Sequence, residues 1–203
     1  MIEWFLLGGF FMWPILIGSI WALALLIERT IYYTQLKKAL TRESEEFFGW
    51  SKRDGVAKAY CLLEGRTGIL PDLLRAAWSP EYTQMSLVER NVEEVLHENR
   101  PHLEKSLNTL ATLASIQPLL GLLGTISGMI ATFSVISTQG TGDPRALADG
   151  ISEAMITTEA GLCVALPILL AHNYLRNRYK NILASLQKFC ARSLKEKEQH
   201  GAA

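Results

Sequence analysis

Two glutamates stand in or beside an otherwise apolar stretch in the last third of the chain. The 22 residues from Ala154 to Leu175 contain one charged side chain, Glu159, and Glu153 directly precedes them. No Lys or Arg lies within about two helical turns of either glutamate. An ionised acid at the centre of a bilayer costs at least about 2.5–3.5 kcal/mol, so such residues usually face a cavity, a partner or a proton path. The two glutamates therefore predict proton chemistry inside a membrane.

Small and hydroxyl-bearing residues recur at helical spacing in two apolar stretches. The first face is formed by Gly121, Thr125, Gly128 and Thr132, and the second by Gly150, Ala154, Thr157, Gly161 and Ala165. Gly124 and Gly128 also form a GxxxG pair, which lets two helix backbones approach closely. We therefore predict that four glycines serve helix packing, namely Gly121, Gly124, Gly128 and Gly161.

Counting the helical rise along the two stretches places hydroxyls and carboxylates at similar depths in the membrane. If antiparallel helices are centred near residues 124 and 161, Thr125 and Thr158 lie at the same level. Glu153 then lies about 7–8 Å nearer one end, at 1.5 Å per residue. These residues and Glu159 predict a hydrated proton pathway. Glu159 points about 120° away from Glu153 on a helix, so both line one path only if they face different neighbours.

Three charge-free or nearly charge-free runs are long enough to cross a bilayer. Besides residues 154–175, they are Trp4–Ile27, with 24 residues, and Ser106–Gly142, with 37. A transmembrane helix needs about 20 apolar residues. We predict an all-α membrane protein with three transmembrane helices. Prolines are tolerated in such helices and mark kinks, here expected at Pro14, Pro118 and Pro167.

The distribution of Lys and Arg predicts the topology. The chain carries 20 basic and 20 acidic side chains, and the cluster of Arg176, Arg178 and Lys180 after the third run places the C-terminus inside and the N-terminus outside. The predicted segments are a first span with a short periplasmic N-terminus (1–27), a cytoplasmic helical region (28–106), a second span (107–137), a periplasmic loop (138–147), a third span (148–175) and a cytoplasmic helical tail (176–203).

Apolar stripes continue beyond the second and third spans. One stripe consists of Val88, Val92, Val95, Leu103, Leu107, Leu110 and Ala114, and the other of Leu175, Tyr179, Ile182, Leu186 and Phe189. They predict long cytoplasmic helical extensions in an oligomeric bundle. Packing within one chain or between subunits would cover these stripes, and we favour subunits because one chain has only three spans. We also expect a capping box at Ser86–Glu89 and a bend at Pro101.

Several functions lack the residues they need. His97 and His102 do not have the spacing of a metal-binding HExxH helix, and Pro101 falls between them, so no metal site is predicted. The chain has no phosphate-binding glycine loop, no nucleophilic serine motif and no basic patch with interleaved aromatics. We therefore expect no enzymatic activity, no nucleic-acid binding and no cofactor, with protons as the coupling ion.

Two ordered motifs resemble the ExbB/TolQ/MotA proton-channel family, and ExbB and TolQ proteins most closely. Residues 118–130, PLLGLLGTISGMI, followed by Phe133, resemble the second-span motif of ExbB and TolQ. Residues 150–158, GISEAMITT, followed by Gly161, Pro167 and Asn173, resemble the third-span motif. The resemblance covers about residues 105–180 and places the family's pore threonines at Thr125 and Thr158 and its glutamate at Glu153. Glu159 stands where many members have a small residue.

The resemblance implies a multi-pass protein of the bacterial inner membrane that forms a homo-oligomer, expected to be a pentamer. Its expected partners are membrane lipid, an ExbD/TolR-type protein with a single span, and a TonB/TolA-type protein that crosses the periplasm. Proton flow would energise the TonB/TolA-type protein. Two alternatives are a membrane scaffold that conducts nothing and a MotA-like stator, although MotA chains generally have four spans.

Overall fold

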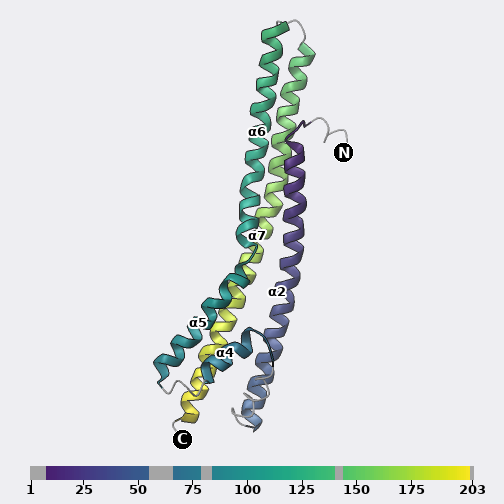
Figure 1. Ribbon diagram of the computed structural model, residues 1–203. Coiled ribbons are helices and arrows are strands. Elements are labelled where there is room, and N and C mark those ends of the chain that lie inside the picture. Colours follow the sequence, from purple (N-terminus) through teal and green to yellow (C-terminus); the bar gives the residue numbers. More distant parts are fainter. Residues whose placement is uncertain (1–7, 55–65, 79–83, 140–143, 202–203) are drawn as a thin grey trace. The chain divides into compact units, whose positions relative to one another are not determined.

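The computed structural model describes residues 8–54, 66–78, 84–139 and 144–201, and every element in these ranges is a helix (Figure 1). The helices are α2 (Met12–Asp54), α4 (Ile69–Trp78), α5 (Met85–Glu104), α6 (Leu107–Gln139) and α7 (Pro144–Gly201). No strand occurs in the described ranges. The predicted all-α fold is confirmed.

Three helices are long and apolar enough to cross a membrane. They lie within Met12–Arg53, Ser86–Thr138 and Ala148–Lys195, and only 17%, 22% and 28% of their most apolar windows are buried inside the chain. Large apolar side chains such as Ile17, Leu119 and Leu170 are more than half exposed. Apolar surface on this scale is rare on a soluble monomer, whereas lipid covers it in a bilayer. The three predicted transmembrane helices are confirmed.

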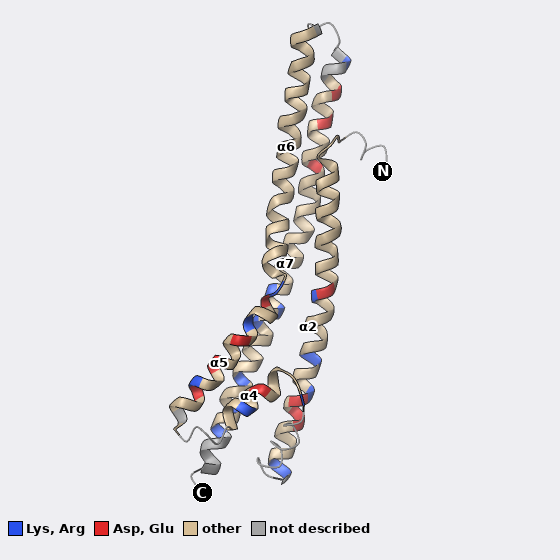
Figure 2. Ribbon diagram, in the orientation of Figure 1, with Lys and Arg blue, Asp and Glu red and all other residues tan. Residues whose placement is uncertain are grey.

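The chain divides into two compact units. The apolar unit comprises Met1–Arg29 and Ser106–Leu175, and the charged unit comprises Thr30–Lys105 and Arg176–Ala203. Figure 2 shows that most Lys, Arg, Asp and Glu residues lie on elements of the charged unit, namely α4, α5 and the adjoining parts of α2 and α7. Each unit has its own core.

The core of the apolar unit combines small and branched side chains from α2, α6 and α7. Ala22 and Leu110 are fully buried, and Ile15, Ala165 and Ile168 are at most 6% exposed. Since lipid is as apolar as these side chains, their association depends on close packing and interhelical hydrogen bonds.

The core of the charged unit contains the stripe predicted on the C-terminal part of α7. Tyr179, Ile182, Leu186 and Phe189 are all buried, and the Phe189 ring contacts Phe47 of α2 with ring centroids 5.7 Å apart. The predicted helical extension is confirmed. The preference for neighbouring subunits as its cover is wrong, because the chain's own helices already bury it.

One local prediction about α5 is also wrong. The helix begins at Met85 after Gln84, which makes no side-chain capping bond, so Ser86 and Glu89 form no capping box. Pro101 lies inside α5, where the bend expected at it stays a prediction, and the helix ends at Glu104 before Lys105 and Ser106, where Ser106 has a φ of 67°. Because Pro101 and His97 are both exposed, water can satisfy the His97 carbonyl that the proline leaves without a helical donor.

Candidate intramembrane polar site

Helices α6 and α7 touch through their backbones at Gly121. The Thr158 hydroxyl donates to the Gly121 carbonyl at 3.0 Å, and a Cβ added at Gly121 would lie 3.0 Å from the Thr158 Cα. Thr125 lies one turn along α6, and its hydroxyl donates to the Leu122 carbonyl at 2.7 Å. The structure thus places the two threonines on adjacent turns of neighbouring helices. With their protons given to carbonyls, both hydroxyl oxygens keep lone pairs that can accept from water.

The other packing glycines join the same two helices. A Cβ at Gly128 would lie 3.0 Å from the Ala154 Cβ, and one at Gly161 would lie 2.7 Å from the Gln117 carbonyl oxygen. A Cβ at Gly124 would overlap the side chain of Thr157. The small-residue faces of α6 and α7 therefore pack against each other within one chain.

Glu153 lies beside the turn that precedes α2. Gly9 has a φ of +68°, and its missing side chain leaves the space that the Glu153 carboxylate occupies. Next to it, the Thr157 hydroxyl oxygen lies 2.7 Å from the Gly8 carbonyl oxygen and 2.8 Å from the Glu153 carbonyl oxygen, so its one proton is shared between the two acceptors. The glutamate is nevertheless exposed. The turn at Gly8–Gly9 leaves room for the Glu153 side chain, which remains open to a neighbour or to water.

Glu159 lies on a separate part of the α7 surface. It is exposed, and six residues of helix separate it from Glu153 by about 9 Å and about 120° of rotation. Its surroundings are apolar and exposed as well, since Met155 is 67% and Leu162 48% exposed. The structure therefore does not bring the two glutamates together, and a path that used both would need surfaces from outside this chain.

Gln117 is a buried polar residue that the sequence analysis did not single out. Its side chain is 1% exposed, and its Nε2 donates to the Ile15 carbonyl of α2 at 3.3 Å. The amide occupies the position where Gly18 has no side chain. A glutamine within a charge-free run of 37 residues is the signal that could have identified it. Thr157 was noted only as a small residue, and its bond to Gly8 required the fold.

The three prolines have different positions in their helices. Pro118 and Pro167 lie inside α6 and α7. Pro14 is the third residue of α2, where a helix has no carbonyl for the missing N–H. Pro14 therefore marks the start of a helix and does not interrupt one.

These features define a class of protein: a multi-span helical membrane protein with hydroxyls and exposed carboxylates on tightly packed intramembrane helices. Residues 66–188 match the model of the MotA/TolQ/ExbB proton channel family.

Similar proteins agree with this match. The chain is 34% identical to an ExbB-like biopolymer transport protein (ExbB-like 1) of Synechocystis over 86% of this chain and 70% of that protein. It is 28% identical to a second one (ExbB-like 3) over 89% of this chain and 87% of that protein. It is also 30% identical to the Tol-Pal system protein TolQ of Pseudomonas aeruginosa, over 65% of this chain and 53% of TolQ.

The chain belongs to the MotA/TolQ/ExbB proton channel family. It is a multi-pass inner-membrane protein of a family whose members are named as transport and channel proteins, not as enzymes.

Proposed function

We propose that the chain is a subunit of an inner-membrane proton-channel motor that uses the proton motive force to energise a TonB/TolA-type protein spanning the periplasm. The names of its relatives, biopolymer transport proteins and a Tol-Pal system protein, support this assignment. An ExbD/TolR-type partner with one span completes the motor. The N-terminus faces the periplasm and the C-terminus the cytoplasm, as the Lys and Arg distribution favours.

The observation that carries the proposal is the exposure of Glu153 and Glu159 on an apolar transmembrane helix. Carboxylates in this position face lipid unless a partner covers them, and facing lipid is costly. A ring of subunits, which we expect to be a pentamer around the partner's span, encloses them. Thr125 and Thr158 then supply oxygen atoms for a chain of water molecules along the path.

Three conservative variants test the pathway. Thr125→Val and Thr158→Val keep the side-chain shape but remove a hydroxyl that water bonds, and Glu153→Gln removes the exchangeable carboxyl. Each proton that crosses 100 mV supplies about 2.3 kcal/mol, and a blocked path delivers none of it. Partner-dependent transport in cells should therefore fall at least about tenfold, which corresponds to about 1.4 kcal/mol.

Thr112→Val is the matched control, because Thr112 is exposed and its hydroxyl donates to the Asn108 carbonyl of its own helix, at 2.9 Å. It should retain full transport. The purified complex is checked for integrity in every variant. Full transport in all three pathway variants with an intact complex would contradict the proton path and leave a scaffold that conducts nothing.

A further inference from the structure

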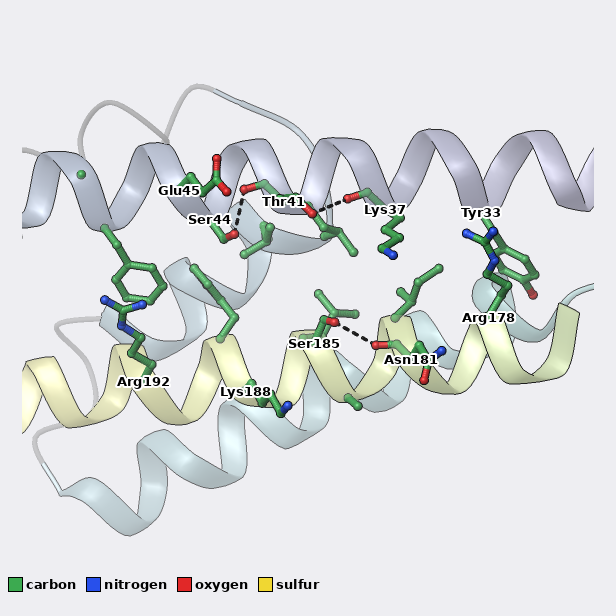
Figure 3. Close-up of a pocket in the computed structure, with 18 of the residues that line it drawn as sticks. Tyr33, Lys37, Thr41, Ser44, Glu45, Arg178, Asn181, Ser185, Lys188 and Arg192 are labelled. Atoms are coloured by element: carbon green, nitrogen blue, oxygen red, sulfur yellow. Dashed lines mark hydrogen bonds between the residues drawn. The ribbon is translucent and has the colours of Figure 1, made fainter. Parts of the chain in front are cut away.

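A groove with a volume of about 900 Å³ lies within the charged unit between α2 and α7. Figure 3 shows Lys37, Thr41 and Ser44 on α2 opposite Ser185 on α7, and Lys188 of α7 also contributes to the lining. Leu70 of α4 contributes to its lining. The groove is open along α2 from Tyr33 to Lys52, a length of about 28 Å at 1.5 Å per residue.

The lining has an apolar floor and a basic rim. Leu40, Ile182, Leu186 and Phe189 lie at the floor and are at most 7% exposed, because the chain's own helices cover them, so the surface open to an occupant is mainly that of the rim. The rim carries five cations and one acid, namely Lys37, Lys52, Arg178, Lys188 and Arg192, with Glu45 as the acid. Among the described residues of the charged unit, ion pairs join Arg42 and Arg66 to Glu46 and Arg75 to Asp72, and the three rim lysines take part in none of them. An elongated, acidic occupant fits this rim.

Helix α5 has this character on its outer face. Glu93 and Glu94 are exposed there, about 100° apart around the helix, and Glu89 and Glu98 are exposed at its two edges, about 180° apart, with the cation of Arg90 between them. Leu87 is 42% exposed and offers an apolar contact. With 20 residues, α5 is about 30 Å long, which matches the groove.

The chain's own α5 does not occupy the groove. Its inner face is fixed elsewhere in the charged unit, because the Tyr33 hydroxyl donates to the Leu103 carbonyl at 2.6 Å and Asn91 Nδ2 donates to the Ala76 carbonyl at 3.1 Å. No residue of α5 lines the groove. One chain thus presents a basic groove and an acidic helix face that it does not join to each other.

We infer that the acidic outer face of α5 from a second copy of this chain occupies the basic groove between α2 and α7. The contact joins two different surfaces, so it is heterologous, and repetition of such a contact closes a ring when the rotation permits. The inference rests on the proposed function, because a motor of this kind is a homo-oligomer. It adds the surfaces through which the subunits recognise each other outside the apolar spans.

Disulfide trapping at the centre of both surfaces tests the contact without assuming a helix direction. Ser185 lies midway along the groove wall and Glu94 midway along α5, and both are exposed. In a chain whose native cysteines are replaced by alanine, Ser185→Cys with Glu94→Cys should give a ladder of covalent oligomers in oxidised membranes. Co-expression of the two single variants should give a dimer and no higher species, because each pair of chains then forms one bond.

Charge reversal is the second arm. Lys37→Glu with Lys188→Glu should reduce the oligomer fraction in native mass spectrometry at least about tenfold, and adding Glu94→Lys with Glu98→Lys should restore it.

The outcomes separate this inference from the proposed function. An oligomeric wild type with no ladder and no response to charge reversal overturns the inference and leaves the proposed function standing. A phospholipid adduct in native mass spectrometry that is lost in the Lys37→Glu, Lys188→Glu protein, again without a ladder, assigns the groove to anionic lipid. That result also overturns the inference. A monomeric wild type overturns both.

Discussion

Gly161 and Gly49 both lie in helices, but their surroundings are opposite. A Cβ at Gly161 would lie 2.7 Å from the Gln117 carbonyl oxygen and 3.2 Å from the Gly121 Cα, whereas nothing lies within 4 Å of a Cβ at Gly49. Backbone atoms of a packed helix cannot yield without separating α6 from α7. Insertion of a methyl group into such a contact costs about 1–3 kcal/mol.

Gly161→Ala should therefore lower the free energy of unfolding by about 1–3 kcal/mol. Gly49→Ala should raise it by about 0.5–1 kcal/mol, because alanine is the better helix former. Thermal unfolding of the two purified variants in the same detergent measures both effects. A Gly161→Ala protein as stable as the wild type would show that α6 and α7 are not in backbone contact there.

Tyr179 makes the stability of the charged unit sensitive to alkaline pH. Burial, and then the hydrogen bond that its hydroxyl donates to Glu104 Oε1 at 2.6 Å, raise the pKa of Tyr179 to about 12. An unfolded tyrosine has a pKa of about 10. The raised pKa means that the stabilisation is complete below about pH 10 and is lost as the pH rises towards about 12.

Tyr179→Phe should remove this part of the alkaline destabilisation and cost about 1 kcal/mol at neutral pH, the value of one hydrogen bond. The measurement is the difference between the unfolding free energies of wild type and variant from pH 8 to pH 12, which cancels the other groups that titrate there. A difference that stays constant over this range would mean that Tyr179 has an ordinary pKa.

At the scale of elements, the break between α5 and α6 depends on one strained residue. Ser106 has a φ of 67°, a conformation that costs an L-residue about 1–2 kcal/mol and costs glycine almost nothing. Its hydroxyl is only a distant acceptor, 3.4 Å from Arg29 Nη2. Ser115 is the matched control, because it is an exposed serine inside α6.

Ser106→Gly should raise the free energy of unfolding by about 0.5–1 kcal/mol, because the relief of strain exceeds the loss of one long hydrogen bond. Ser115→Gly should lower it by about 0.5–1 kcal/mol, since glycine weakens a helix interior. Thermal unfolding of the two variants measures these opposite changes in the free energy of unfolding. A destabilised Ser106→Gly would mean that the serine hydroxyl, and not its backbone, matters at the break.

The elements that could be predicted from the sequence are those defined by local patterns. Charge-free runs of bilayer length gave the three spans, and the helical period of Tyr179, Ile182 and Leu186 gave the extension of α7. The break at Ser106 could not be predicted in this way. The position of the break holds a serine and not the glycine or asparagine that would signal a left-handed backbone. Pro101, the residue most expected to end a helix, is tolerated on an exposed face of α5.

The candidate site could be predicted only in part from the sequence, for the same reason. Thr125 and Thr158 could be placed at one level by counting helical rise, and the structure puts Thr158 against Gly121. The bond from Thr157 to Gly8 joins residues 149 positions apart, and that from Gln117 to Ile15 joins residues 102 apart. No local pattern encodes such pairs, because they depend on how the first helix packs against the other two.

At the scale of the whole molecule, orientation in the membrane is the property on which the proton path depends. Cys163 and Cys190 are poor reporters of it. Burial raises the pKa of the Cys190 thiol to about 12, so little thiolate exists to react with a maleimide on either side of the membrane. Cys163 is exposed, but it lies within an apolar span. A cysteine-free chain with one introduced thiol avoids both problems.

Thr138→Cys and Gln187→Cys form a suitable pair in that cysteine-free chain, because both native residues are exposed, at the end of α6 and on the C-terminal part of α7, and Gln187 does not line the groove. With the N-terminus in the periplasm, an impermeant maleimide should label Thr138→Cys in intact cells whose outer membrane is permeable. It should label Gln187→Cys only after the inner membrane is lysed, because the Lys and Arg residues that follow the third span hold that part of α7 in the cytoplasm. Labelling of Gln187→Cys before lysis would reverse the topology, and with it the direction in which protons reach Glu153.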